Sequence, residues 1–389
     1  YSPINMGIYD LTSIGYNISN SGTYNNELGA SYADGLLDST LKADNKKTIE
    51  LGADFRFFKN RLGLNVTWFN SKSELLYNRT DIISPASGYS SIIANYGSYR
   101  NRGWEVSLTG TAITTKNFSW NIGANWSTFD RRWIKHPNPD AWSHDGSPVD
   151  LIYGEGYIRT PDGQLVHGSD GLLMRFRDAG QGSARRIMGE ADPDWSWGVT
   201  NSFSYKDFRL TFQFDGVVGG KFHDYVRQKT LQGGRHLETA TGLWGEHRPD
   251  DVGAGSLVQP GITLTGGNII LDPITGEIMN FKDLTVAPNT KATSVQNYSS
   301  RYASLQELNI INKTFAKLRE VTLTYSLPAS ILGKSFIRKA EVSFVGRNLL
   351  LFFPKKYKDV DPDQFTQAGS SDLQTPTTRR FGVNINLTF

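Results

Sequence analysis

The sequence contains no cysteine among its 389 residues and only 4 methionines. Without thiols the chain can form no disulfide framework, no thiolate metal site and no cysteine nucleophile. A surplus of charge of one sign is also lacking, because the formal net charge is only +3. Such a balance favours neither the basic surface of a nucleic-acid-binding protein nor an acidic disordered tail. Nucleic acid is therefore not an expected partner.

Long apolar runs are missing as well. The longest run, Leu349 to Phe353, falls far short of the roughly 18 residues that suggest a membrane helix. The opening stretch YSPINMGIYD lacks the positive start and apolar core of a secretory signal, so we expect that a leader was removed or lies upstream. The negative mean hydropathy alone would class the chain as soluble. That conclusion fails if the membrane segments are strands.

Glycine (39 residues) and aromatic residues (12%) are abundant, a mixture that favours strands and turns over helices. In the stretch FSWNIGANWS, the apolar residues Phe118, Trp120 and Ile122 alternate with Ser119 and Asn121. The same alternation recurs in about nine stretches, each of a length that suits a tilted membrane strand. The predicted strands are 48–58, 61–70 (extending to about 78), 103–112, 118–127, 195–205, 208–216, 319–328, 340–348 and 380–389.

The connections between these strands alternate strictly in length. Those after Phe58, Ile113, Tyr205 and Leu327 are short, whereas those spanning 81–98, 136–194, 231–313 and 352–378 are long. Outer-membrane barrels show this asymmetry, with short periplasmic turns and long external loops. It predicts a periplasmic carboxy terminus and an extracellular loop region at residues 1–47, with the barrel over 48–389.

The fold class predicted from these patterns is all-β, a transmembrane antiparallel β-barrel. The alternative is a soluble sandwich, in which one face of each sheet packs on a second sheet. Aromatic residues near the strand ends favour the barrel, because they are typical of interfacial girdles. The face opposite the apolar rows carries charged residues, which suits a barrel interior: Glu50, Asp54, Arg56, Glu105, Arg209, Asp215 and Glu320.

About nine strands in an open sheet would leave two edges of unpaired N–H and C=O groups in hydrocarbon, at several kcal/mol for each group. We therefore expect the sheet to close against further strands. An odd number of strands, with the first entering from outside, favours an amino-terminal portion over copies of this chain as their source.

Several stretches, in this order, resemble the SusC/RagA group of TonB-linked outer-membrane transporters. They are NYGSYRNRGWEVSLTG (95–110), FSWNIGANWS (118–127), GYIRTPDGQLVHGSDG (156–171), IMGEADPDWSWGVTNSFSYKDFRLTFQFDGVVGG (187–220), FAKLREVTLTYSLP (315–328), GRNLLLF (346–352), YKDVDPD (357–363) and the terminal Phe389. The resemblance runs from about Lys47 to Phe389. It implies that this chain supplies about nine carboxy-terminal strands of a plugged barrel of roughly 22 strands.

The resemblance also implies a function and partners. It implies import of a nutrient too large for porins, an oligosaccharide or a peptide, driven through TonB by way of a plug domain that this chain lacks. A SusD-like surface lipoprotein would serve as a lid, and outer-membrane lipid would surround the barrel. No cofactor and no enzymatic activity are expected. The alternatives are a passive porin or structural barrel, and a secreted β-sandwich that binds glycans.

No catalytic group of residues is predicted. None of the six histidines has the i, i+4 spacing of a metal helix, and His144-Asp145 lacks the serine of a triad. Turn chemistry explains the Asp-Pro-Asp stretches at 192–194 and 361–363 better than calcium binding does. GVVGGK (216–221) lacks the spacing of a phosphate-binding loop.

Ligand or lid contacts are expected in the long loops. Aromatic rings stack on sugar faces, and three tryptophans lie in or beside these loops, with two arginines in the same part of the sequence. The candidates are Trp133, Trp142, Arg185, Arg186 and Trp244. Loop packing is the alternative for each of them.

The last strand is a candidate assembly signal. Every second residue from Phe381 is apolar, and the chain ends on an aromatic residue. The resemblance implies that the outer-membrane insertion machinery recognises such a strand. The residues concerned are Phe381, Val383, Ile385, Leu387 and Phe389.

Overall fold

The structure is a computed structural model that describes residues 2–3, 16–24, 27–32, 35–37, 42–79, 85–87, 89, 91–251, 253–333, 336–354, 360–365 and 377–389. Its strands are β1 (Ser2–Pro3), β2 (Tyr16–Tyr24), β3 (Glu27–Tyr32), β4 (Gly35–Leu37), β5 (Asn45–Phe57), β6 (Leu62–Arg79), β7 (Ser91–Thr114), β8 (Phe118–Lys135), β9 (Leu151–Gly154), β10 (Val166–His167), β11 (Arg186–Glu190), β12 (Trp195–Tyr205), β13 (Phe208–Val218), β14 (Lys221–His223), β15 (Ile262–Gly266), β16 (Thr285–Pro288), β17 (Ile310–Asn312), β18 (Phe315–Ser326), β19 (Lys339–Phe352) and β20 (Arg380–Thr388). Its α-helices are α1 (Tyr225–Gln232), α2 (Gly242–His247), α3 (Val295–Ser304) and α4 (Ala329–Leu332). None of the helices described is long and apolar enough to cross a membrane.

Nine long strands form the main sheet, in the order β5-β6-β7-β8-β12-β13-β18-β19-β20, with the short strands β1 and β4 paired to it. These are the nine stretches in which the sequence alternates, so the predicted strands are confirmed. The chain divides into two compact units, one of Tyr1–Ala53, Thr67–Trp104 and Phe129–Val149, the other of Asp54–Val66, Glu105–Thr128 and Asp150–Phe389. Strands β5 to β8 have residues in both units, and each unit is described by itself below.

The register of the second unit keeps the apolar residues on one face across six strands. One continuous row of paired residues runs from β20 to β8 and is apolar throughout: Val383, Phe344, Leu323, Leu210, Phe203 and Trp120. The adjacent row is polar throughout: Asn384, Ser343, Thr324, Arg209, Ser204 and Ser119. Because neighbouring residues of a strand point to opposite faces, this sheet has one apolar and one polar face.

Aromatic residues gather in rows near both ends of the apolar face in this unit. Near the short turns, one row contains Tyr325, Phe208, Tyr205 and Phe118. Towards the other end, Trp197 pairs with Trp126. Such aromatic rows mark the two membrane interfaces of a transmembrane barrel.

The connections follow the predicted alternation, with two differences. The connection after β18, predicted to be short, contains 12 residues, including helix α4. The turns after β5, β7 and β12 contain 4, 3 and 2 residues, as the strand bounds show. The long connection expected over 81–98 is shorter than predicted, because β7 already begins at Ser91. The alternation of apolar and polar residues is weak in this part of β7, because it contains small residues and an Asn-Tyr-Gly stretch.

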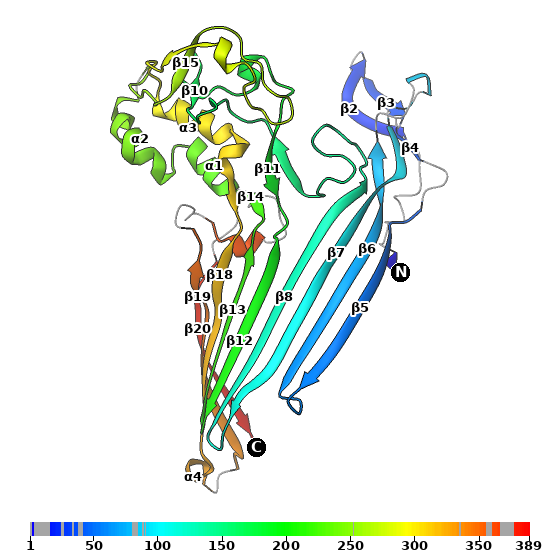
Figure 1. Cartoon of the computed structure of the whole chain (residues 1–389), viewed down its shortest axis with the longest axis vertical. Helices are drawn as coiled ribbons and strands as arrows, with labels where there is room; N and C mark the ends of the chain where they lie inside the picture. Colours follow the sequence, from blue (N-terminus) through cyan, green and yellow to red (C-terminus); the bar gives the residue numbers. More distant parts are fainter. Residues whose placement is uncertain are drawn as a thin grey trace. The chain divides into compact units, whose positions relative to one another are not determined.

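The long connections of the second unit contain folded structure that the sequence pattern did not predict. Residues 150–194 and 219–314, which we call the loop assembly, include β9–β11, β14–β17 and helices α1–α3. They gather at one end of β12, β13 and β18 (Figure 1). Two apolar clusters support the assembly, one around Ile158 and Phe176 and the other around Leu173 and Tyr298. These connections therefore form a packed structure with its own core.

The carboxy terminus lies at the opposite end of this unit, near α4 (Figure 1). The ring of Phe389 stacks on that of Phe336, which belongs to the connection between β18 and β19, with centroids 5.5 Å apart. The chain thus ends on the side of the short turns after β7 and β12 (Figure 1).

Candidate functional site

A cluster of five charged residues lies on the polar face of the second unit, and we call it the ion cluster: Asp215, Lys317, Arg319, Asp361 and Asp363. Lys317 Nζ lies 2.7 Å from Asp361 Oδ2 and 3.0 Å from Asp363 Oδ2. Arg319 donates to both oxygens of Asp363, at 2.6 and 2.8 Å. The same guanidinium also donates to both oxygens of Asp215.

A β-bulge in β18 turns the two cations of the ion cluster to the polar face. Gln213 pairs with Glu320 and Phe214 with Leu318, which leaves Arg319 as an extra residue. Opposite the same point in β19, Asn348 adopts a left-handed conformation with φ of 54°. Bulges of this kind redirect side chains, and here Arg319 and Lys317 both come to lie on the polar face.

The ion cluster fixes the segment after β19 to the strands. Lys317 is almost fully buried, and its ammonium would be costly to bury without the two carboxylates. Although burial acts to raise the pKa of Asp363, the hydrogen bonds from Arg319 and Lys317 hold it below the usual 3.8. Residues 360–365 are thus held against β13 and β18 by charge-assisted hydrogen bonds, the stronger kind.

A second buried ion pair holds the loop assembly together. Arg186 Nη1 lies 2.9 Å from Glu307 Oε2, and the guanidinium packs over the ring of Phe176 at 5.2 Å. It also donates to the carbonyl oxygens of Tyr157 and Gly276, at 3.2 and 2.8 Å. Arg186 therefore links three segments of the assembly, and packing accounts for its position without a ligand.

The structure separates the two neighbouring arginines that the sequence placed together. Arg185 is half-buried and donates to the carbonyl oxygens of Gly182 and Ala184, at 2.6 and 2.8 Å. Trp244 packs in the loop assembly, edge-on to the rings of Tyr298 and Tyr302 at 5.7 and 5.5 Å. Of these three candidates, Arg185 keeps the most freedom to contact a ligand or a lid.

The other two candidates lie in the first unit. The ring of Trp133 lies edge-on to Tyr99 at 6.1 Å and to His136 at 4.8 Å, and among the residues described nothing accepts a hydrogen bond from its buried Nε1. Trp142 is half-buried in a turn, where its backbone N–H donates to Asp140 Oδ1 at 2.8 Å. Trp133 thus carries a polar atom for which the described part of this unit supplies no acceptor.

The remaining polar motifs have structural roles. The ring of His144 bonds the backbone carbonyl of Asp145 at 2.8 Å, an arrangement unlike that of a triad. The glycines of GVVGGK form a turn in which Gly219 and Gly220 have φ of 78° and 73°. Within the described ranges, no group of three His, Asp or Glu residues is placed to hold a metal ion.

The last strand lies at an edge of the main sheet. β20 pairs with β19 only, and its predicted assembly residues are all exposed, with Phe381 at 78% and Phe389 at 64%. An edge of this kind in hydrocarbon leaves backbone groups without partners unless another strand pairs with it.

The sequence reasoning missed the ion cluster and Glu307. FAKLRE and YKDVDPD lie about 40 residues apart in the sequence, and turn chemistry alone was expected to explain Asp361 and Asp363. The available signal was charge, because two cations of one quoted stretch match two carboxylates of the other.

Comparisons with known proteins identify the fold. No protein-family model matches the chain. TonB-dependent receptor P3 of Formosa agariphila is 25% identical over 393 residues, which are 90% of this chain and 35% of that receptor. TonB-dependent receptor P39 of the same organism is 23% identical over 401 residues, covering 87% of this chain and 35% of the receptor.

Solved structures agree with these relatives. The RagAB peptide importer in its open-open state matches with a TM-score of 0.64 at 20% identity, over 99% of this chain and 38% of its own. The RagAB peptide transporter gives 0.63 at 19% identity, over 99% and 39%. The resemblance to TonB-linked transporters of the SusC/RagA group is thus confirmed, and the fold is that of their transmembrane antiparallel β-barrel. The chain spans about a third of the length of the relatives that it matches.

Proposed function

We propose that this chain forms part of an outer-membrane barrel that imports a large nutrient with energy supplied through TonB. The observation that carries the proposal is the similarity to TonB-dependent receptors over 90% of the chain. The two-faced sheet supports it, because one face is apolar across six strands and the other is polar and charged. Residues 1–47 would form an external loop region and 48–389 the barrel strands.

The proposed substrate is an oligosaccharide or a peptide. Two tryptophans and one arginine remain as candidate contacts, since Arg186 and Trp244 are engaged in packing: Trp133, Trp142 and Arg185. The Trp133 Nε1–H is buried and has no acceptor among the described residues, so a sugar hydroxyl or a peptide carbonyl would accept from it only after the side chain turned. The RagAB matches are peptide transporters, which makes a peptide the second substrate class to test.

The proposed protein partners are a SusD-like surface lipoprotein, TonB through a plug domain, and an amino-terminal portion that supplies the remaining strands. Exposed apolar side chains on the hairpin around 270–279 of the loop assembly offer a contact for the lipoprotein. Met279 N–H bonds the carbonyl of Ile270 at 2.9 Å, and Ile270, Ile274 and Met279 are 51%, 47% and 66% exposed. Hydrophobic side chains at the centre of an interface supply most of its affinity.

Energy-dependent uptake tests the function. Cells that carry the intact protein should take up labelled oligosaccharides or peptides, and a protonophore should stop this uptake. Uptake that persists without a proton gradient would support the passive porin instead. Co-purification tests the lid: a SusD-like lipoprotein should be recovered in detergent with the wild type and lost with Ile270→Asp/Met279→Asp. Lys282→Asp, an exposed change just after the hairpin, serves as the control.

A further inference from the structure

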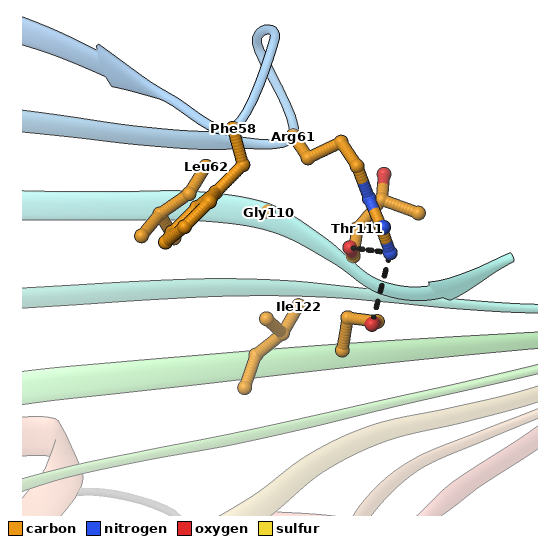
Figure 2. A pocket seen from close by; sticks show the side chains of 7 residues that line it. Phe58, Arg61, Leu62, Gly110, Thr111 and Ile122 are labelled. Atoms are coloured by element: carbon orange, nitrogen blue, oxygen red, sulfur yellow. Dashed lines mark hydrogen bonds between the residues drawn. The ribbon is translucent and has the colours of Figure 1, made fainter.

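A hollow of about 350 Å³ opens on the apolar face of the second unit, beside the turn between β5 and β6 (Figure 2). Its lining comes from that turn and from β6, β7 and β8: Phe58, Arg61, Leu62, Gly110, Thr111, Ala112 and Ile122. Volumes of this size are at the lower end of the range for small-molecule sites.

The hollow exists because two small residues occupy the apolar face of β7. The Thr111 hydroxyl donates to Asn121 at 2.7 Å on the polar face, so Gly110 and Ala112 point to the apolar face. A Cβ added at Gly110 would approach Leu62 Cδ1 to 3.2 Å. Larger side chains at these two positions would therefore fill the space between Leu62 and Ile122.

A cation stands at the rim of the hollow. Arg61 Nη2 donates to the carbonyl oxygens of Thr111 and Ala112, at 3.2 and 3.1 Å (Figure 2). Within the described ranges no carboxylate pairs with this exposed guanidinium. The two neighbouring turns, FKNR at 58–61 and TKN at 115–117, add Lys59 and Lys116 and contain no acidic residue.

The position of the hollow matches the edge of a bilayer. Phe118 of the aromatic row lies on the same strand as Ile122, and four residues of strand extend about 13 Å. The lining thus runs from the level of the aromatic row and the basic turns to the deeper level of Ile122. A headgroup phosphate suits the basic end, and acyl chain suits the apolar end.

We propose that this hollow is a binding site for one phospholipid, with the headgroup phosphate on the Arg61 guanidinium and part of an acyl chain over Gly110 and Ala112. The proposal rests on the membrane-barrel part of the proposed function. The ring of Phe58, which is 75% exposed, flanks the chain end of the lipid. Arginine suits this role because its planar fork binds phosphate with two hydrogen bonds.

Native mass spectrometry of the intact protein tests the site. The protein is delipidated in a neutral detergent and titrated with phosphatidylglycerol, with a diacylglycerol of the same chains, and with inorganic phosphate. We expect one tightly retained phosphatidylglycerol, and little retention of either other probe. Arg61→Gln should weaken phosphatidylglycerol retention by roughly tenfold or more, because charge-assisted hydrogen bonds are lost. Arg61→Lys should have an intermediate effect.

A second variant tests the apolar end independently. Ala112→Phe keeps the charge of Arg61 and fills the hollow, so it should also abolish the tight site. Lys206→Gln, which removes an exposed cation from the turn between β12 and β13, should leave retention unchanged. Heat-dependent migration on gels verifies that each variant is folded.

Three results would overturn the proposal. Equal retention by the wild type, Arg61→Gln and Ala112→Phe would mean non-selective surrounding lipid only. If diacylglycerol were retained as well as phosphatidylglycerol, the phosphate would not contribute to binding. If inorganic phosphate bound as well as the lipid, the acyl chain would not contribute. Because retention is measured without transport, a failed uptake experiment leaves the lipid result standing, and the reverse also holds.

Discussion

Replacing Lys317 by methionine should release the segment around 360–365 from the polar face. The side chain of Lys317 is only 2% exposed, and those of its partners Asp361 and Asp363 are 12% and 18% exposed. Methionine keeps the length of the side chain but removes the charge. Asp363 retains Arg319, whereas Asp361 loses its only cation among the described contacts.

The magnitude follows from the burial of this ion pair. Removing one partner of a buried pair costs about 3–5 kcal/mol, and we expect the lower end because Asp361 keeps some contact with water. A loss of about 3 kcal/mol in the free energy of opening corresponds to roughly a hundredfold faster hydrogen exchange of a locally opening segment. The exchange of the peptide that contains 360–365 is measured by mass spectrometry on the intact protein.

A matched control separates burial from charge. Arg347 pairs with Glu320 at 2.8 Å in the same sheet, but these side chains are 60% and 35% exposed. Arg347→Gln should therefore change exchange by about fivefold or less. If Lys317→Met accelerated exchange no more than Arg347→Gln does, the ion cluster would not be what holds the segment.

Three further predictions concern the loop assembly and the apolar face. Arg186→Ala should destabilise the loop assembly by about 1–3 kcal/mol, because the buried Glu307 then keeps only the more exposed Arg159 as a partner. Arg185→Ala should change the stability by no more than about 0.5 kcal/mol, and equal proteolysis rates of the two variants would contradict this. Burial lowers the pKa of His167 below its usual 6.5, so the folded state keeps this ring neutral where the unfolded chain is protonated. The contribution of His167 to stability is therefore complete well above pH 6.5 and declines below it. His167→Gln should reduce this decline, as measured by hydrogen exchange corrected for intrinsic rates. On the apolar face, Trp120→Phe should lower the free energy of unfolding in denaturant by about 1–2 kcal/mol, because Asn201 Oδ1 loses the hydrogen bond that Trp120 Nε1 donates at 3.0 Å. Asn201→Leu in the same background should restore the stability.

The sequence predicted the strands well because their alternation is a local property. The alternation within each stretch shows which of its residues face the apolar side and which the polar side. Short turns show that consecutive strands are neighbours in the sheet. The five predicted contact residues fared differently. Trp244 is a candidate because a loop gives a tryptophan little reason to pack, and Arg186 because it lies nearby in the sequence, yet the loops fold around Phe176 and Tyr298. Such packing depends on contacts between residues about 120 apart, as between Arg186 and Glu307, and no local pattern reports it.

The ion cluster shows where a strict period of two fails and why. Beyond the bulge, Val321, Leu323 and Tyr325 are the apolar residues of β18, so an unbroken alternation would place Arg319 and Lys317 on the same apolar face. Ala316 lies level with the Trp197–Trp126 row, so a cation at 317 or 319 would face lipid near the membrane interface, where the cost is about 0–1 kcal/mol and rises towards about 2–4 kcal/mol at the midplane. The bulge removes that cost by shifting the phase of the strand by one residue, while Leu318 still pairs with Phe214 on the apolar face. In this strand the bulge therefore brings the two out-of-phase cations of FAKLRE to the polar face. The same bulge gives Asp361 and Asp363 their partners Lys317 and Arg319. It therefore both keeps these cations away from lipid and anchors the segment after β19.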